Sequence, residues 1–204
     1  MDEAFSNTDA GRDHLSGSAV SEVYLRTERL SLRRVVEADV DHLVMLNADQ
    51  DVMRFIARTP PTPHEVHADV EQILRAYERF PDHGTFIAED CDGGFLGWFA
   101  LMVREAGPAA PDLGYRLRRA AWGRGLATEG GRALVDHAFA HLGTERVTAD
   151  TMAVNRASRR VMEKCGLRYV RTFHPEFDDP LPGTEHGDVL YEITREEWAG
   201  RRRR

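Results

Sequence analysis

The chain has 204 residues, with 27 lysines and arginines against 34 aspartates and glutamates, and a formal net charge of −7. Four of the basic residues are the terminal Arg201–Arg204, so the remainder carries 23 basic against 34 acidic residues, a net charge of −11. An acidic body argues against nucleic acid as a partner, because phosphate backbones bind basic surfaces. The length and the 42% of hydrophobic residues suit one folded domain with a full core.

Neither membrane insertion nor secretion is indicated. No apolar run approaches the roughly 20 residues that span a bilayer, and residues 1–22 lack the apolar core of a secretion signal. Cys91 and Cys165 are far apart, which favours a reducing compartment without a disulfide framework. We therefore expect a cytoplasmic protein: a disordered or loosely docked arm over 1–22, one domain over 23–198 and a basic tail over 199–204.

The periodicity of apolar residues alternates between strands and helices along the chain. The predicted strands cover residues 30–35, 85–88, 95–103, 112–117, 146–151, 169–173 and 189–193. The predicted helices cover residues 37–47, a segment from 62 to about 80, a segment that follows the Gly-rich residues 122–131, and 155–165. Thr62 and Glu65 form a capping box, Asp92-Gly93 marks a hairpin turn, and Gly166 ends the last helix. The order predicts an α/β fold with a mixed sheet.

The most informative segment is Trp122-Gly123-Arg124-Gly125-Leu126-Ala127-Thr128-Glu129, which lies between a predicted strand and a predicted helix. Glycines allow a tight turn and leave room for a ligand. The first amides of a helix, together with its dipole, bind anions such as a pyrophosphate. By itself the segment equally fits an ordinary Gly-rich turn. It is neither a P-loop nor a dinucleotide-binding motif, because no lysine follows the glycines and the third glycine is absent.

With a second block, the sequence resembles the GNAT superfamily of N-acetyltransferases, most closely its RimJ/RimL-like branch, the ribosomal-protein-alanine type. Trp122, Gly125 and Ala127 occupy the positions of that superfamily's loop motif, and Asn155-Arg156-Ala157-Ser158 followed by Glu163-Lys164-Cys165-Gly166-Leu167 is similar to its next block. The resemblance covers roughly residues 25–198. It implies a mostly antiparallel sheet of six to seven strands, flanked by helices, with a V-shaped splay between the fourth and fifth strands.

The resemblance further implies that acetyl-CoA is the co-substrate and an amine the acceptor. Backbone amides of residues 123–128 would hold the pyrophosphate, the Leu117 amide would face the thioester carbonyl, and Asn155 would bond the pantetheine. Asn155 is equally suited to cap the following helix. The residues expected to contact the cofactor are Leu117, Arg118, Trp122, Gly123, Arg124, Gly125, Leu126, Ala127, Thr128, Asn155 and Ser158.

Acetyl transfer also needs a base for the amine and a proton for the departing thiolate. Asp112, at the start of the fourth predicted strand, matches an acidic position of the family and is one candidate base, with a solvent-facing strand end as the alternative. His174 is another, since its unperturbed pKa lies near 6.5. Many relatives carry a tyrosine as the acid seven residues after the Asn, where this chain has Met162. Ser158 is a weak substitute; Leu117, through its amide, completes the expected catalytic set.

The acidic segment 176–188 is expected to form one wall of the acceptor pocket, and the helix over 62–80 the opposite wall. No metal is expected, because neither His174 with His186 nor His137 with His141 matches a known ligand pattern. A homodimer is left open by the resemblance. Two alternatives to an active enzyme remain: a CoA-binding sensor without turnover, and a protein that binds nucleotide phosphates through the loop alone.

Overall fold

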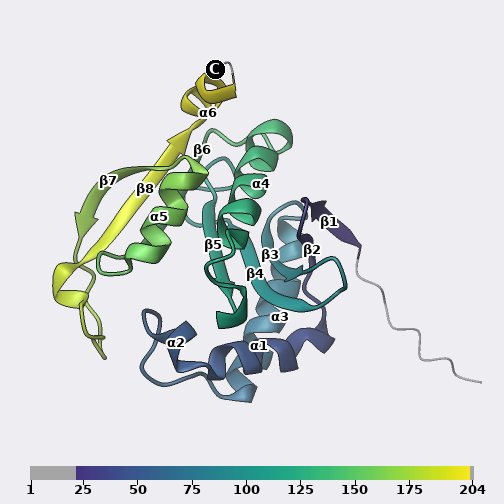
Figure 1. The fold of residues 1–204 in the computed structure, drawn as a ribbon, viewed down its shortest axis with the longest axis vertical. Coiled ribbons are helices and arrows are strands. Elements are labelled where there is room, and N and C mark those ends of the chain that lie inside the picture. The colour runs from purple at the N-terminus through teal and green to yellow at the C-terminus, as the bar shows by residue number, and fades with distance from the viewer. Residues whose placement is uncertain (1–21, 203–204) are drawn as a thin grey trace, which may run out of the picture.

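The structure, a computed structural model, describes residues 22–202 (Figure 1). All but the last residue of the expected N-terminal arm lies outside that range. One sheet of eight strands organises the fold, in the order β1-β2-β3-β4-β5-β6-β8-β7. The strands are β1 (Val23–Arg26), β2 (Ser31–Arg34), β3 (Gly84–Glu89), β4 (Phe95–Met102), β5 (Asp112–Leu117), β6 (Arg146–Met152), β7 (Arg168–Phe173) and β8 (Asp188–Thr194). The helices are α1 (Val40–Ala48), α2 (Gln50–Met53), α3 (Pro63–Arg79), α4 (Leu126–His141), α5 (Arg156–Cys165) and α6 (Arg195–Arg202).

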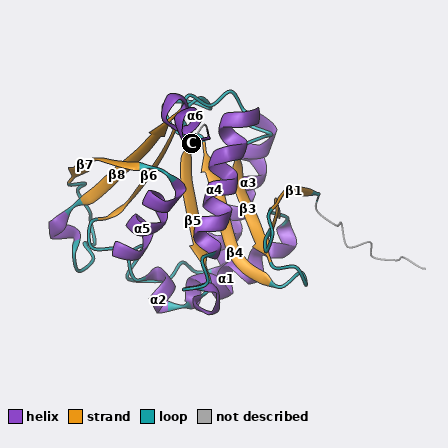
Figure 2. Cartoon of the chain, turned by 45° about the horizontal axis from the view of Figure 1, so that its top comes forward, coloured by secondary structure: helices purple, strands orange, loops and turns teal. Residues whose placement is uncertain are grey.

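Helices cover both faces of this sheet, α4 and α5 on one and α3 on the other (Figures 1 and 2). Successive side chains on a strand point to opposite faces, and two hydrophobic clusters follow from this alternation. Phe86 and Phe99 belong to the larger cluster, with residues of α4 and α5. Ile87, the next residue after Phe86, belongs to the smaller cluster, with Val66 and Val70 of α3.

The local signals in the sequence are confirmed. Thr62 caps α3 and Glu65 reaches back to its backbone N–H at 2.7 Å. The turn at Gly93, which has a φ of 81°, joins β3 to β4 as an antiparallel pair. Gly166, with a φ of 103°, ends α5. Both cysteines are unpaired, and burial raises the pKa of the Cys165 thiol to about 12.

The structure differs from the sequence-based expectation at both edges of the domain. The sheet has eight strands rather than six or seven, because β1 was not predicted; it pairs with β2 over only a few irregular positions. The segment 37–47 begins as a 3-10 turn, Glu37–Asp39, and becomes α-helical only from Val40. The expected boundary at residue 198 falls inside α6, which Trp198 holds to α4 by stacking on Phe139 and donating to Asp136.

Candidate active site

The turn before α4 is built around two glycines in the left-handed region of the backbone. Gly123 has a φ of 71° and Gly125, the N-cap of α4, a φ of 80°, angles that L side chains rarely adopt. The first intrahelical bond runs from the Glu129 amide to the Gly125 carbonyl, at 3.0 Å, so the amides of residues 125–128 have no partner within the helix. A Cβ at Gly123 would meet nothing within 4 Å. The turn therefore presents unbonded helix amides to open space, as an anion site requires.

Neighbouring side chains hold this turn in one conformation. Arg29 donates to the Arg124 carbonyl at 2.9 Å and forms an ion pair of 2.5 Å with Glu129. Burial opposes ionisation of Glu129, but hydrogen bonds from Thr27 and Arg29 outweigh it and hold its pKa below the usual range. Glu129 thus has the structural role expected of an acid at a helix N-terminus. On the other side, the Trp122 indole N–H donates to the Leu117 carbonyl at 2.8 Å and ties the turn to the end of β5.

The two arginines before the turn are both engaged with the protein. Arg118 donates to the Phe95 carbonyl at 3.0 Å, and Arg119 forms an ion pair with Asp51. Both are exposed. Arg119 is therefore a solvated surface residue, and Arg118 lies beside the turn.

The V-shaped splay expected between the fourth and fifth predicted strands lies between β5 and β6. These two strands run parallel and share a single bridge, Asp112 with Thr148. The Arg118 amide bonds Leu96 on β4, and bonding alternates along an antiparallel pair. The Leu117 amide therefore points away from β4, into the splay. A backbone N–H fixed in this way can stabilise an oxyanion.

The start of α5 brings Asn155, Ser158 and Met162 to the same splay. Asn155 caps α5 by accepting from the Ser158 amide at 3.2 Å, and its Nδ2 donates to Thr151 at 3.1 Å. Met162 is buried at the position where many relatives carry a tyrosine, and a methionine supplies no phenol. Tyr115 of β5 supplies one instead, with its hydroxyl 2.9 Å from the Ser158 Oγ and 3.0 Å from the Ser158 carbonyl.

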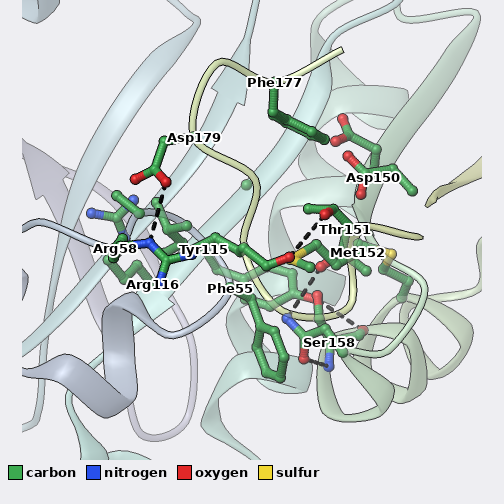
Figure 3. A pocket seen from close by; sticks show the side chains of 18 of the residues that line it. Phe55, Arg58, Tyr115, Arg116, Asp150, Thr151, Met152, Ser158, Phe177 and Asp179 are labelled. Atoms are coloured by element: carbon green, nitrogen blue, oxygen red, sulfur yellow. Dashed lines mark hydrogen bonds and ion pairs between the residues drawn. The ribbon is translucent and has the colours of Figure 1, made fainter. Parts of the chain in front are cut away.

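A cavity of about 570 Å³ opens from the splay toward the loops (Figure 3). It is lined by residues 55–59, Trp98, residues 113–116, residues 150–152, Asn155, Ser158, Met162, Phe177, Asp179, Leu181, Thr184 and Asp188. The acidic loop before β8 forms one wall, as expected. The expectation that α3 forms the opposite wall is wrong, because no residue of α3 lines the cavity. The reason is that α3 buries its apolar face against the sheet. Residues 55–59, which precede α3, line the cavity instead and meet the acidic loop where Arg58 pairs with Asp179.

The two candidate bases from the sequence do not line this cavity. The Asp112 carboxylate accepts a hydrogen bond from Thr148 and forms an ion pair with Arg104. His174 is exposed just after β7. Its imidazole lies beside Gly187, where an added Cβ atom would be 3.0 Å from Nε2. Asn155 and Ser158 thus lie together in the cavity, but Asp112 and His174 do not join them.

Two other aspartates, which sequence reasoning missed, do line the cavity. Asp150 of β6 and Asp188 of β8 are on the same face of adjacent strands, because Asp150 pairs with Leu190 and Asp188 with Met152. Asp150 is exposed to the cavity, but partial desolvation by the surrounding protein raises the pKa of its carboxyl, and the charge of Asp112 raises it further. Burial also raises the pKa of Asp188, with Asp150 adding to the shift. Asp188 Oδ1 is buried without a hydrogen-bond partner among the described residues.

The arrangement of turn, splay and cavity can be compared with known proteins. A family model described as an acetyltransferase (GNAT) domain matches residues 29–168. The chain belongs to the GNAT family. The splay between β5 and β6 and the glycine turn before α4 are therefore features of a GNAT acetyltransferase, an enzyme that depends on acetyl-CoA.

Individual GNAT proteins resemble most of the chain. A protein named FsC-acetyl coenzyme A-N(2)-transacetylase, from Aspergillus fumigatus, is 35% identical over 182 residues, which cover 85% of this chain and 77% of that protein. A structure of RimL, a ribosomal L7/L12 alpha-N-protein acetyltransferase, in complex with coenzyme A has a TM-score of 0.72 at 18% identity, covering 85% of this chain and 98% of RimL. Spermidine N-acetyltransferase from Vibrio cholerae, in complex with CoA and spermine, has a TM-score of 0.69 at 17% identity, covering 85% and 99%.

Metal and membrane sites were also searched for. Among residues 22–202, no group of three or more histidines, cysteines or acids is placed to hold a metal ion. The rings of His137 and His141 lie with their centroids 4.9 Å apart and their planes tilted by 46°. Within the same range, no helix is both long and apolar enough to cross a membrane.

Proposed function

We propose that this GNAT enzyme transfers the acetyl group of acetyl-CoA to a primary amine, by direct attack while both substrates are bound. The observation that carries the proposal is the meeting of two different surfaces at the splay. One is made of backbone amides, at the turn before α4 and at Leu117. The other is a cavity lined by carboxylates, which favours a cationic amine.

The amide side has the features needed to hold acetyl-CoA. The amides of residues 123–128 bind the pyrophosphate, because both glycines keep the turn open to it. The Leu117 amide bonds the thioester carbonyl and stabilises the negative charge that develops there. Asn155 keeps one acceptor lone pair beyond its cap and can bond an amide N–H of the pantetheine.

Asp150 and Asp188 are the residues best placed to accept the proton of the amine. An alkylammonium has a pKa near 10 and must lose a proton before it attacks. A base works best when its pKa approaches the working pH, and both aspartates are shifted upward from the ordinary range. Their position on the cavity wall favours them over Asp112, which is already paired with Arg104.

Tyr115 and Ser158 are placed to return a proton to sulfur. When the amine nitrogen bonds to the acetyl carbon, the carbon–sulfur bond breaks and the thiolate takes a proton from the Ser158 hydroxyl. Ser158 in turn takes one from Tyr115, and solvent restores the phenol. Burial raises the pKa of Tyr115, so the phenol is protonated at neutral pH. The pair thus supplies the group that Met162 lacks.

The test is a reaction of the purified protein with acetyl-CoA and a panel of amines, from small diamines and amino acids to peptides with free N-termini. We expect an amine-dependent release of CoA thiol together with an acetylated product detected by mass spectrometry. Tight binding of acetyl-CoA without product from any amine would favour a sensor without turnover. Displacement by ATP but not by CoA would instead indicate a nucleotide-phosphate site.

A further inference from the structure

Arg116, on β5, is a half-buried cation that has no ion-pair partner in the described part of the chain. It lines the cavity and lies on the opposite face of β5 from its neighbours Tyr115 and Leu117. Its Nη1 donates to Asn47 of α1, a neutral amide, and its guanidinium lies 5.2 Å from the centroid of the Trp98 ring. Its Nε is buried and has no hydrogen-bond partner among the described residues.

Arg33 is another half-buried arginine, and it has acidic partners. Arg33 binds both oxygens of Asp39 at 2.7 Å and Glu89 at 2.8 Å. A cation withdrawn from water without such a partner is costly. Burial lowers the pKa of Arg116 to about 10, so it is still charged at neutral pH. Asp69 is the carboxylate whose field reaches it, and the two do not form an ion pair.

The cavity separates charge of opposite sign. Figure 3 shows Arg116 on one side and Asp150 on the other, with Tyr115 between them. Arg58, at the same rim as Arg116, is already engaged by Asp179 at 3.2 Å and by the Pro180 carbonyl at 2.9 Å. An acceptor that carried only an amine would satisfy the aspartates and leave Arg116 unpaired.

We propose that Arg116 binds a carboxylate of the acceptor, so that the acceptor is an amine that also carries a carboxylate, such as an amino acid or a compound containing one. This rests on the proposed function, in which the amine of the same molecule faces Asp150 and Asp188. The planar guanidinium suits a carboxylate, because its Nη2 and the second N–H of Nη1 can donate to both oxygens at once. Arg116 is thus a specificity-determining residue. Its side chain is on the opposite face of β5 from that of Leu117.

The first experiment measures kcat/KM for matched acceptors: phenylalanine with phenethylamine, and lysine with cadaverine. The wild type should prefer the carboxylate member of each pair by about 10-fold or more, as loss of a charge-assisted hydrogen bond predicts. In Arg116→Gln the preference should disappear, with the rate on the amine lacking a carboxylate and the affinity for acetyl-CoA little changed. Arg116→Lys should restore part of it. Arg58→Gln is the matched control and should keep the preference, because Arg58 already has a partner.

A second measurement does not depend on turnover. N-acetylphenylalanine and its amide carry no amine, and their binding to the CoA-loaded enzyme can be followed by calorimetry. The acid should bind about 10-fold more tightly than the amide to the wild type and equally to Arg116→Gln. Equal binding to the wild type would overturn the role of Arg116. If amines with and without a carboxylate are acetylated equally well, this inference fails and the proposed function stands. If N-acetylphenylalanine binds more tightly than its amide but no amine is acetylated, this inference stands and the proposed function fails.

Discussion

The amide side and the cavity side of this site are constructed in different ways. The amide side comes from the short segment between Leu117 and Glu129, and its working groups are backbone N–H groups fixed by glycine conformation. The cavity side is assembled from β4, β5, β6, β8, α5 and two loops, and the groups assigned to acceptor binding there are charged side chains. Backbone amides impose little demand on residue type apart from glycine, whereas side chains can change without altering the fold. Cofactor binding is therefore expected to reside in the first region and acceptor choice in the second.

The largest expected effect comes from breaking the amide side at Gly125. Gly125→Glu places a side chain on a backbone with a φ of 80° and a negative charge where the pyrophosphate is expected. The affinity for acetyl-CoA should fall by about 100-fold or more, because repulsion adds to the lost geometry of the amides. Calorimetric titration with acetyl-CoA measures the change.

Gly143→Glu is the matched control for this variant. Gly143 lies just beyond the other end of α4, has a φ of 67°, and a Cβ there would meet nothing within 4 Å. It therefore introduces the same charge and a similar backbone strain of about 1–2 kcal/mol, far from the turn. The melting temperatures of the two variants should fall alike while only Gly125→Glu loses acetyl-CoA. Equal affinities in both variants would remove the turn from the cofactor site.

The difference between the two sides also explains how far the sequence could predict the site. The turn was predictable because its glycines, the preceding strand and the following helix are contiguous, so that local pattern determines the conformation. The same holds for the Asn155 cap, which depends on residues three positions apart. Ser158 and Met162 lie on the predicted helix, α5, for the same reason.

The cavity side depends on strand register, which local pattern does not give. Asp150 and Asp188 meet because β8 lies between β6 and β7 in the sheet. It therefore pairs with β6 as well as with β7, the strand that precedes it in the sequence. A partial signal existed, since Val147 and Ala149 are the core-facing residues of β6 and alternation places Asp150 on the other face. Nothing local indicated that residues 55–59, a segment without regular strand or helix periodicity, would line the cavity.

A smaller effect is expected from neutralising the cavity aspartates. Asp150→Asn and Asp188→Asn should each lower kcat by about 10- to 100-fold, because general-base catalysis contributes effects of that order. Steady-state kinetics at saturating acetyl-CoA measure this, and the affinity for acetyl-CoA should be unchanged. Asp178→Asn is the matched control: Asp178 is exposed in the loop before β8 and does not line the cavity, so kcat should stay as it is.

The same two variants should be more stable than the wild type at neutral pH. Because the folded state raises both pKa values, it binds protons more tightly than the unfolded chain. The wild type therefore loses stability as the pH rises from the ordinary aspartate pKa of about 3.9 to the raised value. Asparagine removes that loss, so the gain in melting temperature should grow between pH 4 and pH 7.5. An equal gain in melting temperature at both pH values would contradict a raised pKa of these carboxyls in the folded state.

The smallest effect is expected where a side chain supports the backbone side, at Trp122. Trp122→Phe keeps the aromatic ring but removes the N–H that donates to the Leu117 carbonyl, a bond of about 0.5–1.5 kcal/mol. The turn and the end of β5 would then be less firmly joined, so both acetyl-CoA affinity and kcat should fall by about 2- to 10-fold. Trp198→Phe is the matched control, because it removes the indole bond from Trp198 of α6 to Asp136 of α4, away from the turn. If Trp122→Phe lowered only the melting temperature, as Trp198→Phe should, the indole would stabilise the fold without positioning the Leu117 amide, and the amide side would depend on glycine geometry alone.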